Sequence, residues 1–598
     1  MLEYGIPALI EVPDNAGLAD VVFSRATANP EEIVLRRRAA DGSWQDVTAE
    51  QFRDQVSALA KALIAAGISP GDRVALMSST RYEWTLADYA IWAAGAVTVP
   101  VYETSSAEQV EWIIGDSGAR AAIAETDKHE ELINGVRARL PDLGQIWRID
   151  GLDQLAAAGS GISDDELRKN RASRAANDLA TIIYTSGTTG RPKGCELTHR
   201  NLLSAARNAH GALPEIFEVP GGSTLLFMPL AHVFARIIEI GCIESGPILG
   251  HWPDVSTVAE GLREFQPTFL LAVPRVFEKV YNTAQQQASA SAAKSKIFAA
   301  AAATAIAFSQ AETAGAASAG LRLRHALFDH LVYGKLRAAI GGNVSYAVSG
   351  GAPLGERLGH FFRGAGITVL EGYGLTETSA AATVNKPRRN KIGTVGQPLP
   401  GTSVRIAEDG EILLRGSIVF TSYWKNPAAT KEAMEDEGWL HTGDIGSLDD
   451  EGFLRVTGRK KELIVTAGGK NVAPAVLEDR LRSHPLVSQC MVVGDNQPFV
   501  ACLITLDPEA LDFWKQQHGK PADATPADLI DDPDLIAEIQ AAVDDANQAV
   551  SRAESIRKFR ILPIDFNIEN GYTTPSLKVR RSVVAKDFAA DIEALYQR

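Results

Sequence analysis

Cysteine, long apolar runs and a leader-like N-terminus are all scarce or missing in this 598-residue chain. Its four cysteines, Cys195, Cys242, Cys490 and Cys502, are scattered without CxxC or zinc-ligand spacing, so we expect reduced thiols in a cytosolic protein. The longest apolar run, at 297–308, is too short to span a bilayer. The first residues are acidic and interrupted by prolines, so we expect no signal peptide.

Basic charge is also in short supply. Lysine and arginine number 59 against 74 aspartate and glutamate residues, a formal net charge of −15. This balance argues against sequence-independent nucleic-acid binding, which needs a basic surface. The hydrophobic fraction of 45% is that of an ordinary globular protein. We therefore expect a cytoplasmic protein with no nucleic-acid partner, attached at most to a membrane surface.

Helical and strand-like segments alternate through the first four hundred residues. Helical spacing covers 51–68, a short apolar strand covers 73–79, and 89–102 contains a helix, a glycine stop and a second strand. This βαβ rhythm predicts a mostly parallel sheet covered by helices. A β-rich piece follows, with strands at 410–416 and 452–459.

The length exceeds what one hydrophobic core supports, so we expect an α/β protein of two domains. The larger domain, residues 1–459, combines parallel and mixed sheets with a β-rich subdomain and a helical insert at about 283–340. The smaller, mobile α/β domain covers 460–598, with a strand at 488–495 and an acidic helix near 534–552.

A glycine- and hydroxyl-rich loop, YTSGTTGRPKG at 184–194, follows a strand of buried character. Loops after strands in open α/β sheets bind ligands, glycines let backbone approach phosphate, and hydroxyls donate to its oxygens. It is not a Walker A loop, because Pro192 stands at the second glycine position and Gly194 follows Lys193. Composition alone leaves a flexible surface loop open as the alternative.

The same loop resembles the signature of the adenylate-forming superfamily, which includes acyl-CoA synthetases, non-ribosomal adenylation domains and firefly luciferases. The resemblance implies that the loop holds the phosphates of ATP. The residues concerned are Thr185, Ser186, Gly187, Thr188, Thr189, Gly190 and Lys193.

Two further motifs resemble nucleotide-binding segments of this superfamily. EGYGLTET at 371–378 implies that Tyr373 lies against adenine, Thr376 touches a phosphate and Glu377 holds Mg²⁺, which prefers oxygen ligands. Gly372 and Gly374 belong to the same implied site. Taken alone, the motif is more typical of a helix start.

The second motif, HTGDIG at 441–446, resembles the ribose motif. It implies that Asp444 accepts hydrogen bonds from the two ribose hydroxyls. An aspartate in a turn is the alternative, and the motif by itself favours it.

GRKKELIVTAGGKNVAP at 458–474 resembles the segment that joins the two domains of the superfamily. The resemblance implies that Arg459 contacts the ribose or phosphate, that Lys461 is the hinge, and that Gly468 and Gly469 line the path of a thiol. A solvated basic turn is the plain interpretation of Lys461, and it is compatible with a hinge.

PSLKVRR at 575–581 places Lys578 on the C-terminal catalytic lysine of the superfamily, an assignment that rests wholly on the resemblance. PLAHVF at 229–234 implies that His232 lies beside the carboxylate being activated, although a lone histidine is more often structural.

SYAVSGGAPL at 345–354 resembles the strand and turn that line the adenine and acyl pocket. It assigns Gly350, Gly351 and Ala352 to that pocket. A tight turn without a ligand is the alternative.

The segment 436–474 and the helical insert are most similar to bacterial long-chain fatty-acid–CoA ligases, and the alanine-rich, arginine-using composition suits a high-GC actinobacterium. The resemblance implies ATP-dependent activation of a fatty acid to acyl-AMP with release of pyrophosphate, then thioester formation with CoA as co-substrate, with Mg²⁺ as the metal. A fatty acyl-AMP ligase that passes the acyl group to a carrier protein stays open, as does a non-catalytic nucleotide-binding protein.

One segment of the insert, 321–340, has helical apolar spacing at Leu323, Leu327, Leu331 and Val332. At 100° per residue, Arg324 and Lys335 fall inside that apolar arc, whereas a clean interfacial helix would segregate them. We therefore expect these apolar residues to pack against the protein's own core. Weak peripheral contact with a membrane is the alternative.

Overall fold

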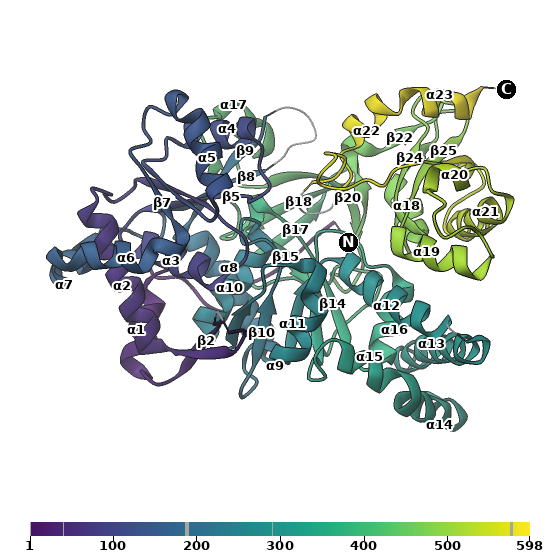
Figure 1. Ribbon diagram of the computed structural model, residues 1–598, viewed down its shortest axis with the longest axis horizontal. Coiled ribbons are helices and arrows are strands. Elements are labelled where there is room, and N and C mark those ends of the chain that lie inside the picture. The colour runs from purple at the N-terminus through teal and green to yellow at the C-terminus, as the bar shows by residue number, and fades with distance from the viewer. Residues whose placement is uncertain (1, 40, 186–190, 290, 575–577, 598) are drawn as a thin grey trace.

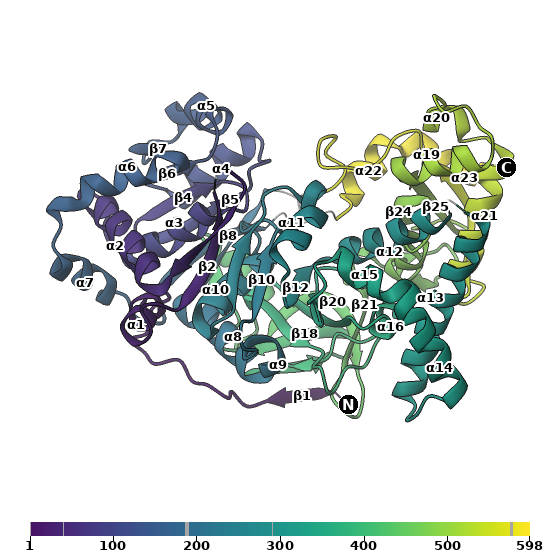
Figure 2. The same ribbon diagram turned by 60° about the horizontal axis from the view of Figure 1, so that its bottom comes forward.

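The chain is described by a computed structural model that covers residues 2–39, 41–185, 191–289, 291–574 and 578–597. Figures 1 and 2 show an N-terminal part made of several sheets and their helices, with the last residues of the chain gathered at one side. The mixed α/β class with several sheets confirms the fold class predicted from the sequence. Among these residues, no helix has both the length and the apolar character needed to cross a membrane.

The central sheet has the strand order β19-β9-β8-β5-β4-β6-β7. Strands β5, β4, β6, β7 and β8 pair in parallel, and β9 and β19 continue the sheet antiparallel at one edge. The strands are β4 (Arg73–Met77), β5 (Val97–Val101), β6 (Ala121–Ala124), β7 (Gln145–Arg148), β8 (Leu179–Thr185), β9 (Lys193–Thr198) and β19 (Ser422–Tyr423).

Helices cover this sheet, as the βαβ rhythm predicts. In α2 (Ala49–Ala65), the Thr48 side chain accepts the Gln51 backbone N–H, which forms a capping box that fixes the helix start. The other helices of this region are α1 (Asp20–Ala28), α3 (Tyr82–Ala93), α4 (Ala107–Ser117), α5 (Asp127–Val136), α6 (Leu152–Ala157), α7 (Asp164–Ala172), α8 (His199–Ala212) and α9 (Pro214–Phe217).

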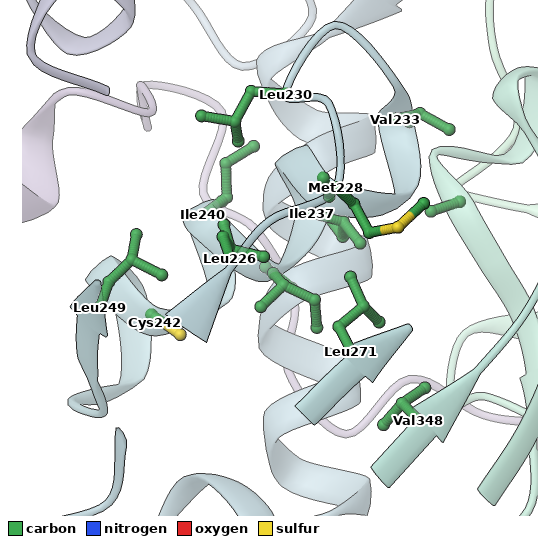
Figure 3. Close-up of a cluster of buried hydrophobic side chains, with 14 of the residues drawn as sticks. Leu226, Met228, Leu230, Val233, Ile237, Ile240, Cys242, Leu249, Leu271 and Val348 are labelled. Carbon is green, nitrogen blue, oxygen red and sulfur yellow. The ribbon is translucent and has the colours of Figure 1, made fainter. Parts of the chain in front are cut away.

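Two further sheets pack around α10 (Val233–Ser245). One is β10 (Ser223–Leu226), β11 (Ile248–His251), β2 (Ile33–Arg38) and β3 (Trp44–Thr48); the other is β12 (Phe269–Ala272), β13 (Tyr346–Ser349), β14 (Thr368–Leu375), β15 (Ala380–Val384) and β16 (Gln397–Pro398). Figure 3 shows Ile237 and Ile240 of α10 in one buried cluster with Leu226, Leu271 and Val348 of these strands. All five side chains are buried, so α10 is held by apolar packing against strands of both sheets.

The β-rich piece is a five-stranded sheet, β1-β17-β18-β20-β21, in which every pairing is antiparallel. Its strands are β1 (Glu3–Ile6), β17 (Thr402–Ile406), β18 (Glu411–Gly416), β20 (Leu440–Leu448) and β21 (Leu454–Arg459), with α17 (Pro427–Ala433) between β19 and β20. The strands expected at 410–416 and 452–459 are therefore present.

The residues after 460 enclose buried clusters of their own. They contain the hairpin β22 (Ile464–Val465) and β23 (Asn471–Val472), the sheet β24 (Val487–Val493), β25 (Val500–Leu506) and β26 (Ile556–Ile561), and the helices α18 (Pro474–Arg482), α19 (Pro508–Gln517), α20 (Pro526–Leu529), α21 (Pro533–Asn547), α22 (Arg581–Asp587) and α23 (Ala589–Tyr596). The boundary between 459 and 460 stays a prediction.

The helix that leads into the insert and a helix that follows it contact this C-terminal part. Arg275 of α12 (Pro274–Ser289) lies 3.1 Å from the Asp507 carboxylate, and Lys279 lies 3.6 Å from that of Glu509. The Arg357 side chain of α16 (Glu356–Gly364) donates to the Ser483 carbonyl over 3.2 Å. The helix α11 (Val258–Phe265) lies earlier in the chain.

The rest of the insert contradicts one expectation. The segment forms α13 (Ala292–Thr313), α14 (Ala319–Phe328), a π-helical turn η5 (Asp329–Tyr333) and α15 (Gly334–Ala339). Val332 packs against the core, but the exposed fractions of Leu323, Leu327 and Leu331 are 75%, 57% and 43%. The expectation that these leucines pack inward is wrong.

Aromatic residues occupy the buried side instead, and two of them are brought together by the π turn. Its i→i+5 hydrogen bonding brings residues five apart onto one side of the helix, whereas a uniform 100° per residue separates them. Phe328 and Tyr333 are both buried, and the Tyr333 hydroxyl donates to the Ala301 carbonyl of α13 over 2.7 Å. The aromatic residues therefore face the core, and the leucines do not.

A fully buried ion pair joins α3, α10 and the central sheet. Arg236 of α10 donates from Nε to Oδ2 of Asp88 in α3 over 2.8 Å, and both side chains have no exposed surface. The guanidinium also donates to the Thr181 hydroxyl of β8 over 2.6 Å. The rings of Trp84 and Trp92 lie 5.4 and 5.0 Å from it. The pair therefore fixes α10 relative to the strand that leads into the 184–194 loop.

We predict that Asp88→Ala lowers the free energy of unfolding by about 3–5 kcal/mol, because Arg236 then stays buried without its counter-charge. Asp46→Ala is the matched control: it removes one partner of the exposed Arg36–Asp46 pair and should cost less than about 1 kcal/mol. Urea unfolding measures both variants. Equal losses would contradict the structural role assigned to the buried pair.

Candidate active site

A cavity of about 2480 Å³ lies where the strand ends of the N-terminal part meet the C-terminal part. Most of the residues that the sequence motifs single out line it, although they come from distant segments of the chain. They are Thr185, His232, Gly350, Gly351, Ala352, Gly372, Tyr373, Gly374, Thr376, Glu377, Asp444, Arg459, Lys461 and Lys578.

The remaining predicted residues have different positions. The Lys193 ammonium lies 5.1 Å from the centre of the Tyr423 ring, next to Glu377. Gly468 and Gly469 are exposed and are not among the cavity-lining residues. The rest of the predicted phosphate loop, Ser186, Gly187, Thr188, Thr189 and Gly190, lies outside the described residues.

Glu377 is positioned by the antiparallel edge of the central sheet. It belongs to the short 3-10 turn η6 (Thr376–Thr378), which follows β14 directly, so the helix start that the motif alone favours does not form. The Tyr423 hydroxyl of β19 donates to Glu377 Oε1 over 2.7 Å. Because β19 pairs with β9, the strand that begins at Lys193, this contact joins the two motifs.

The Glu377 carboxylate is a suitable ligand for a magnesium ion that arrives with a nucleotide. In the part of the chain that the structure describes, no group of three or more histidine, cysteine or acidic side chains is placed to hold a metal alone. Magnesium commonly binds through one or two carboxylates together with substrate phosphates and water. A single carboxylate on the wall of the cavity fits that pattern.

Asp444 forms a second polar centre. Its carboxylate, on β20, accepts from the Tyr373 hydroxyl over 2.7 Å and lies 3.2 Å from Nε of Arg459, its partner across the β20–β21 pair. Burial, reinforced by the Asp444 charge, raises the pKa of Tyr373 well above its usual range, so the hydroxyl stays a donor. The segments 371–378, 441–446 and 458–474 thus meet at one carboxylate.

His232 lies at the N-terminus of α10, and its Nδ1 accepts the Phe234 backbone N–H over 3.2 Å. In the neutral ring the proton is therefore on Nε2. Burial lowers the pKa of His232 to about 4, and the nearby Lys578 cation adds a smaller effect in the same direction. The imidazole is consequently an uncharged hydrogen-bond donor at neutral pH.

Lys578 reaches this cavity from the far end of the sequence. Its backbone N–H donates to the Thr574 hydroxyl over 3.1 Å. Desolvation by surrounding protein atoms is the main cause that lowers the pKa of Lys578, and the Arg459 cation adds to it. Asp444, Glu462 and Glu377 act in the opposite direction. Lys578 lines the same cavity as both polar centres.

Two of the predicted glycines occupy positions that disfavour other residues, one because of a close contact and one because of its backbone conformation. A Cβ on Gly374 would lie 1.6 Å from the Ala380 carbonyl oxygen, so the close approach of β14 and β15 needs glycine. Gly469 has φ +75°, and a Cβ added there would have no atom within 4 Å, so a side chain at this position would meet strain but no neighbour.

Sequence reasoning missed two residues of this site. Tyr423 carries no motif and reaches Glu377 only through strand pairing. Glu371 opens the EGYGLTET motif, but the resemblance implies no role for it. Its side chain is buried, its Oε1 accepts the Leu354 N–H over 2.8 Å, and burial raises its pKa to about 7. An acidic residue at the end of an apolar strand is the signal that could have found it.

The AMP-binding enzyme family matches residues 22–424, and the family's C-terminal domain matches residues 461–598. The chain belongs to the AMP-binding enzyme family. This confirms the superfamily that the motifs resemble.

Similar proteins extend over the whole chain. It is 53% identical over 603 residues to the long-chain-fatty-acid–CoA ligase FadD15 of Mycobacterium bovis, covering 100% of both chains. It is 30% identical to the human long-chain-fatty-acid–CoA ligase ACSBG1, covering 93% of this chain and 82% of that one. A solved adenylation domain of the carboxylate reductase of Mycobacterium chelonae superposes with a TM-score of 0.75 at 21% identity, covering 97% and 91%, which shows the shared fold of AMP-binding enzymes.

We predict that Glu371→Gln makes the free energy of unfolding of this protein less dependent on pH. A buried carboxyl whose pKa rises from 4.5 to about 7 favours the folded state while protonated, so its contribution is lost as pH rises from about 4.5 to 7. The Gln variant should therefore gain stability relative to the parent protein between pH 5 and pH 7.5, by at most about 3 kcal/mol.

Thermal unfolding at these two pH values measures that gain. Glu356→Gln, which changes an exposed carboxylate 3.5 Å from Arg455, should show little change between them. A Gln variant whose difference from the parent is the same at both pH values would contradict the buried, protonated state of Glu371.

Proposed function

We propose that this protein is a cytoplasmic long-chain fatty-acid–CoA ligase that uses ATP, Mg²⁺ and CoA. The full-length 53% identity to a relative of that name carries the proposal. The cavity supports it, because it gathers Glu377, Asp444, Arg459, His232 and Lys578 in one place.

The first half-reaction brings two anions together. A carboxylate oxygen of the fatty acid attacks the α-phosphorus of ATP, the bond to pyrophosphate breaks, and acyl-AMP remains. A carboxylate needs no general base at neutral pH, so the work of the site is positioning and charge neutralisation. We assign the neutral His232 to the acyl carboxylate, where a charged ring is not required, and the Lys578 cation to the point where the two anions meet.

The nucleotide is held from two sides. We assign the ribose hydroxyls to Asp444, whose carboxylate is already oriented by Tyr373 and Arg459. The phosphates are assigned to the 184–194 loop, to Lys193 and to Thr376. A magnesium ion at Glu377 supplies electrostatic stabilisation to the phosphate oxygens when it is bound.

The second half-reaction needs a different arrangement. The CoA sulfur attacks the acyl carbon, AMP leaves with the electron pair of the broken C–O bond, and the thiol proton passes to solvent. Lys578 stands in the cavity while Gly468 and Gly469 lie outside its lining. We propose that the C-terminal residues rotate about Lys461 between the two steps, which withdraws Lys578 and brings the 467–471 segment to the acyl carbon.

The proposed function predicts thioester formation from ATP, CoA and saturated fatty acids of graded length, with the highest kcat/KM for long chains. Exchange of pyrophosphate into ATP reports the first step, and consumption of free thiol reports the second. Exchange without consumption of free CoA would favour a fatty acyl-AMP ligase that serves a carrier protein. A folded protein without exchange for any acid in the panel would overturn the proposal.

Lys578→Ala should separate the two half-reactions. We expect it to lose pyrophosphate exchange by about 10²–10³-fold, the scale for removing one electrostatic group from a transition state. Supplied acyl-AMP and CoA should still give thioester, because the charge of the two reacting anions no longer opposes the reaction. Lys586→Ala, an exposed lysine of α22, is the control and should leave both steps unchanged. Equal damage to both steps in a folded Lys578 variant would contradict the assigned role.

Gly469→Leu should have the opposite effect, with exchange kept and thioester formation lost, if Gly469 lines the path of the thiol. The left-handed φ at this position adds about 1–2 kcal/mol of strain to most side chains, so bulk and strain must be distinguished. Gly469→Asn is the matched variant, because asparagine tolerates this conformation. Strain alone would lower the melting temperature and reduce both steps for Leu while sparing Asn.

A further inference from the structure

A leucine stripe faces away from the protein on the outermost helix of the insert. Leu323, Leu327 and Leu331 are 75%, 57% and 43% exposed and follow one another at intervals of four residues. This spacing places them along one side of α14 and η5. In both Figure 1 and Figure 2, α14 lies at the periphery of the molecule, next to α13.

The opposite side of the same helices is fixed to the protein. The His325 ring stacks on Phe308 of α13 with 3.9 Å between ring centres, and its Nε2 lies 2.6 Å from the Gly364 carbonyl oxygen of α16. Phe328 and Tyr333 are buried on this side. The helices therefore cannot turn the leucines inward without breaking these contacts, and the leucine stripe is a permanent surface.

Basic residues border the stripe. Arg322, Arg324 and Lys335 are exposed. Arg322 lies 3.8 Å from the Glu312 carboxylate of α13, and the acidic residue of this stretch, Asp329, is bound to Arg337 at 2.7 Å. Residues 319–339 contain four lysine or arginine residues and one aspartate, a formal net charge of +3 in a chain of net charge −15. The apolar stripe thus coincides with a local excess of positive charge.

We propose that α14, η5 and α15 form a docking face for a membrane surface that contains anionic lipids. A helix that lies in a bilayer interface inserts an apolar face among the acyl chains and places cationic side chains among the headgroups. The leucine stripe supplies the apolar face, and Arg322, Arg324 and Lys335 supply the cationic side chains. Lysine and arginine stems extend far enough to keep their charges at headgroup level beside an inserted leucine.

The charge also argues against a second copy of the chain as the occupant. A two-fold symmetric dimer would place this face against itself, because such interfaces use the same patch on both subunits. The excess positive charge of this face would then meet the same excess on the second copy, which is unfavourable. An anionic lipid surface has no such conflict. The proposal adds a binding surface to the proposed function and does not depend on it, because binding is measured without substrate.

Flotation of the full-length protein with lipid vesicles tests the docking face. The protein should float with vesicles of phosphatidylcholine and phosphatidylglycerol and remain below vesicles of phosphatidylcholine alone. Leu323→Asp and Leu327→Asp should each lower the membrane partition coefficient by roughly tenfold or more, since each replaces an inserted apolar group by an anion. Leu2→Asp, at a leucine with 72% exposure on the β1 side, should bind as the parent protein does.

The charge is tested separately. Arg324→Glu and Lys335→Glu should weaken binding to phosphatidylglycerol vesicles, and added salt should weaken binding of the parent protein. Melting curves confirm that each variant is folded, as expected for exposed positions. Absence of binding by the parent protein, or binding that the leucine variants leave unchanged, would overturn the proposal. Concentration-dependent dimers that Leu323→Asp dissociates would assign the face to a second copy instead.

Discussion

The buried contact between Asp88 and Arg236 is the constraint on which the geometry of the cavity depends. It joins α3 to α10, and through Thr181 it joins both to β8. His232 stands at the start of α10 and Thr185 at the end of β8, so the contact ties together two elements that each carry a cavity-lining residue. A charge without access to water is stable only while its hydrogen bonds and its counter-charge offset the free energy of removing it from water. The geometry of the pair is therefore tightly constrained.

The cavity is assembled by three kinds of contact with different strengths. Apolar packing holds α10, as the buried side chains of Figure 3 show, and strand pairing holds Tyr423, Asp444 and Arg459 in register. The C-terminal residues meet α12 through surface pairs such as Arg275 with Asp507, and pairs of this kind contribute little to stability. This ordering of strengths is compatible with the proposed rotation of the C-terminal residues.

Predictions from the sequence were accurate where the local pattern and the final structure agree. The strands at 73–79 and 410–416, the helix at 51–68 and the mixed α/β class follow from apolar periodicity, which tertiary contacts reinforce. Periodicity failed at Leu323, Leu327 and Leu331, because apolar spacing does not show which face of a helix its neighbours cover, and His325 and Phe328 lie on the covered face. Tyr423 was missed because a strand pairing between distant segments carries no local signal.

The sequence by itself determined the family and which residues carry its motifs, since Thr185, Tyr373, Glu377, Asp444, Arg459 and Lys578 all stand within short contiguous patterns. Only the tertiary structure decided their charge states and partners. The neutral ring of His232, the raised pKa of the Glu371 carboxyl and the shared carboxylate of Asp444 depend on burial and on groups far away along the chain. Burial and distance are properties of the folded chain, because desolvation and Coulomb energies depend on positions in space and not on order in the sequence.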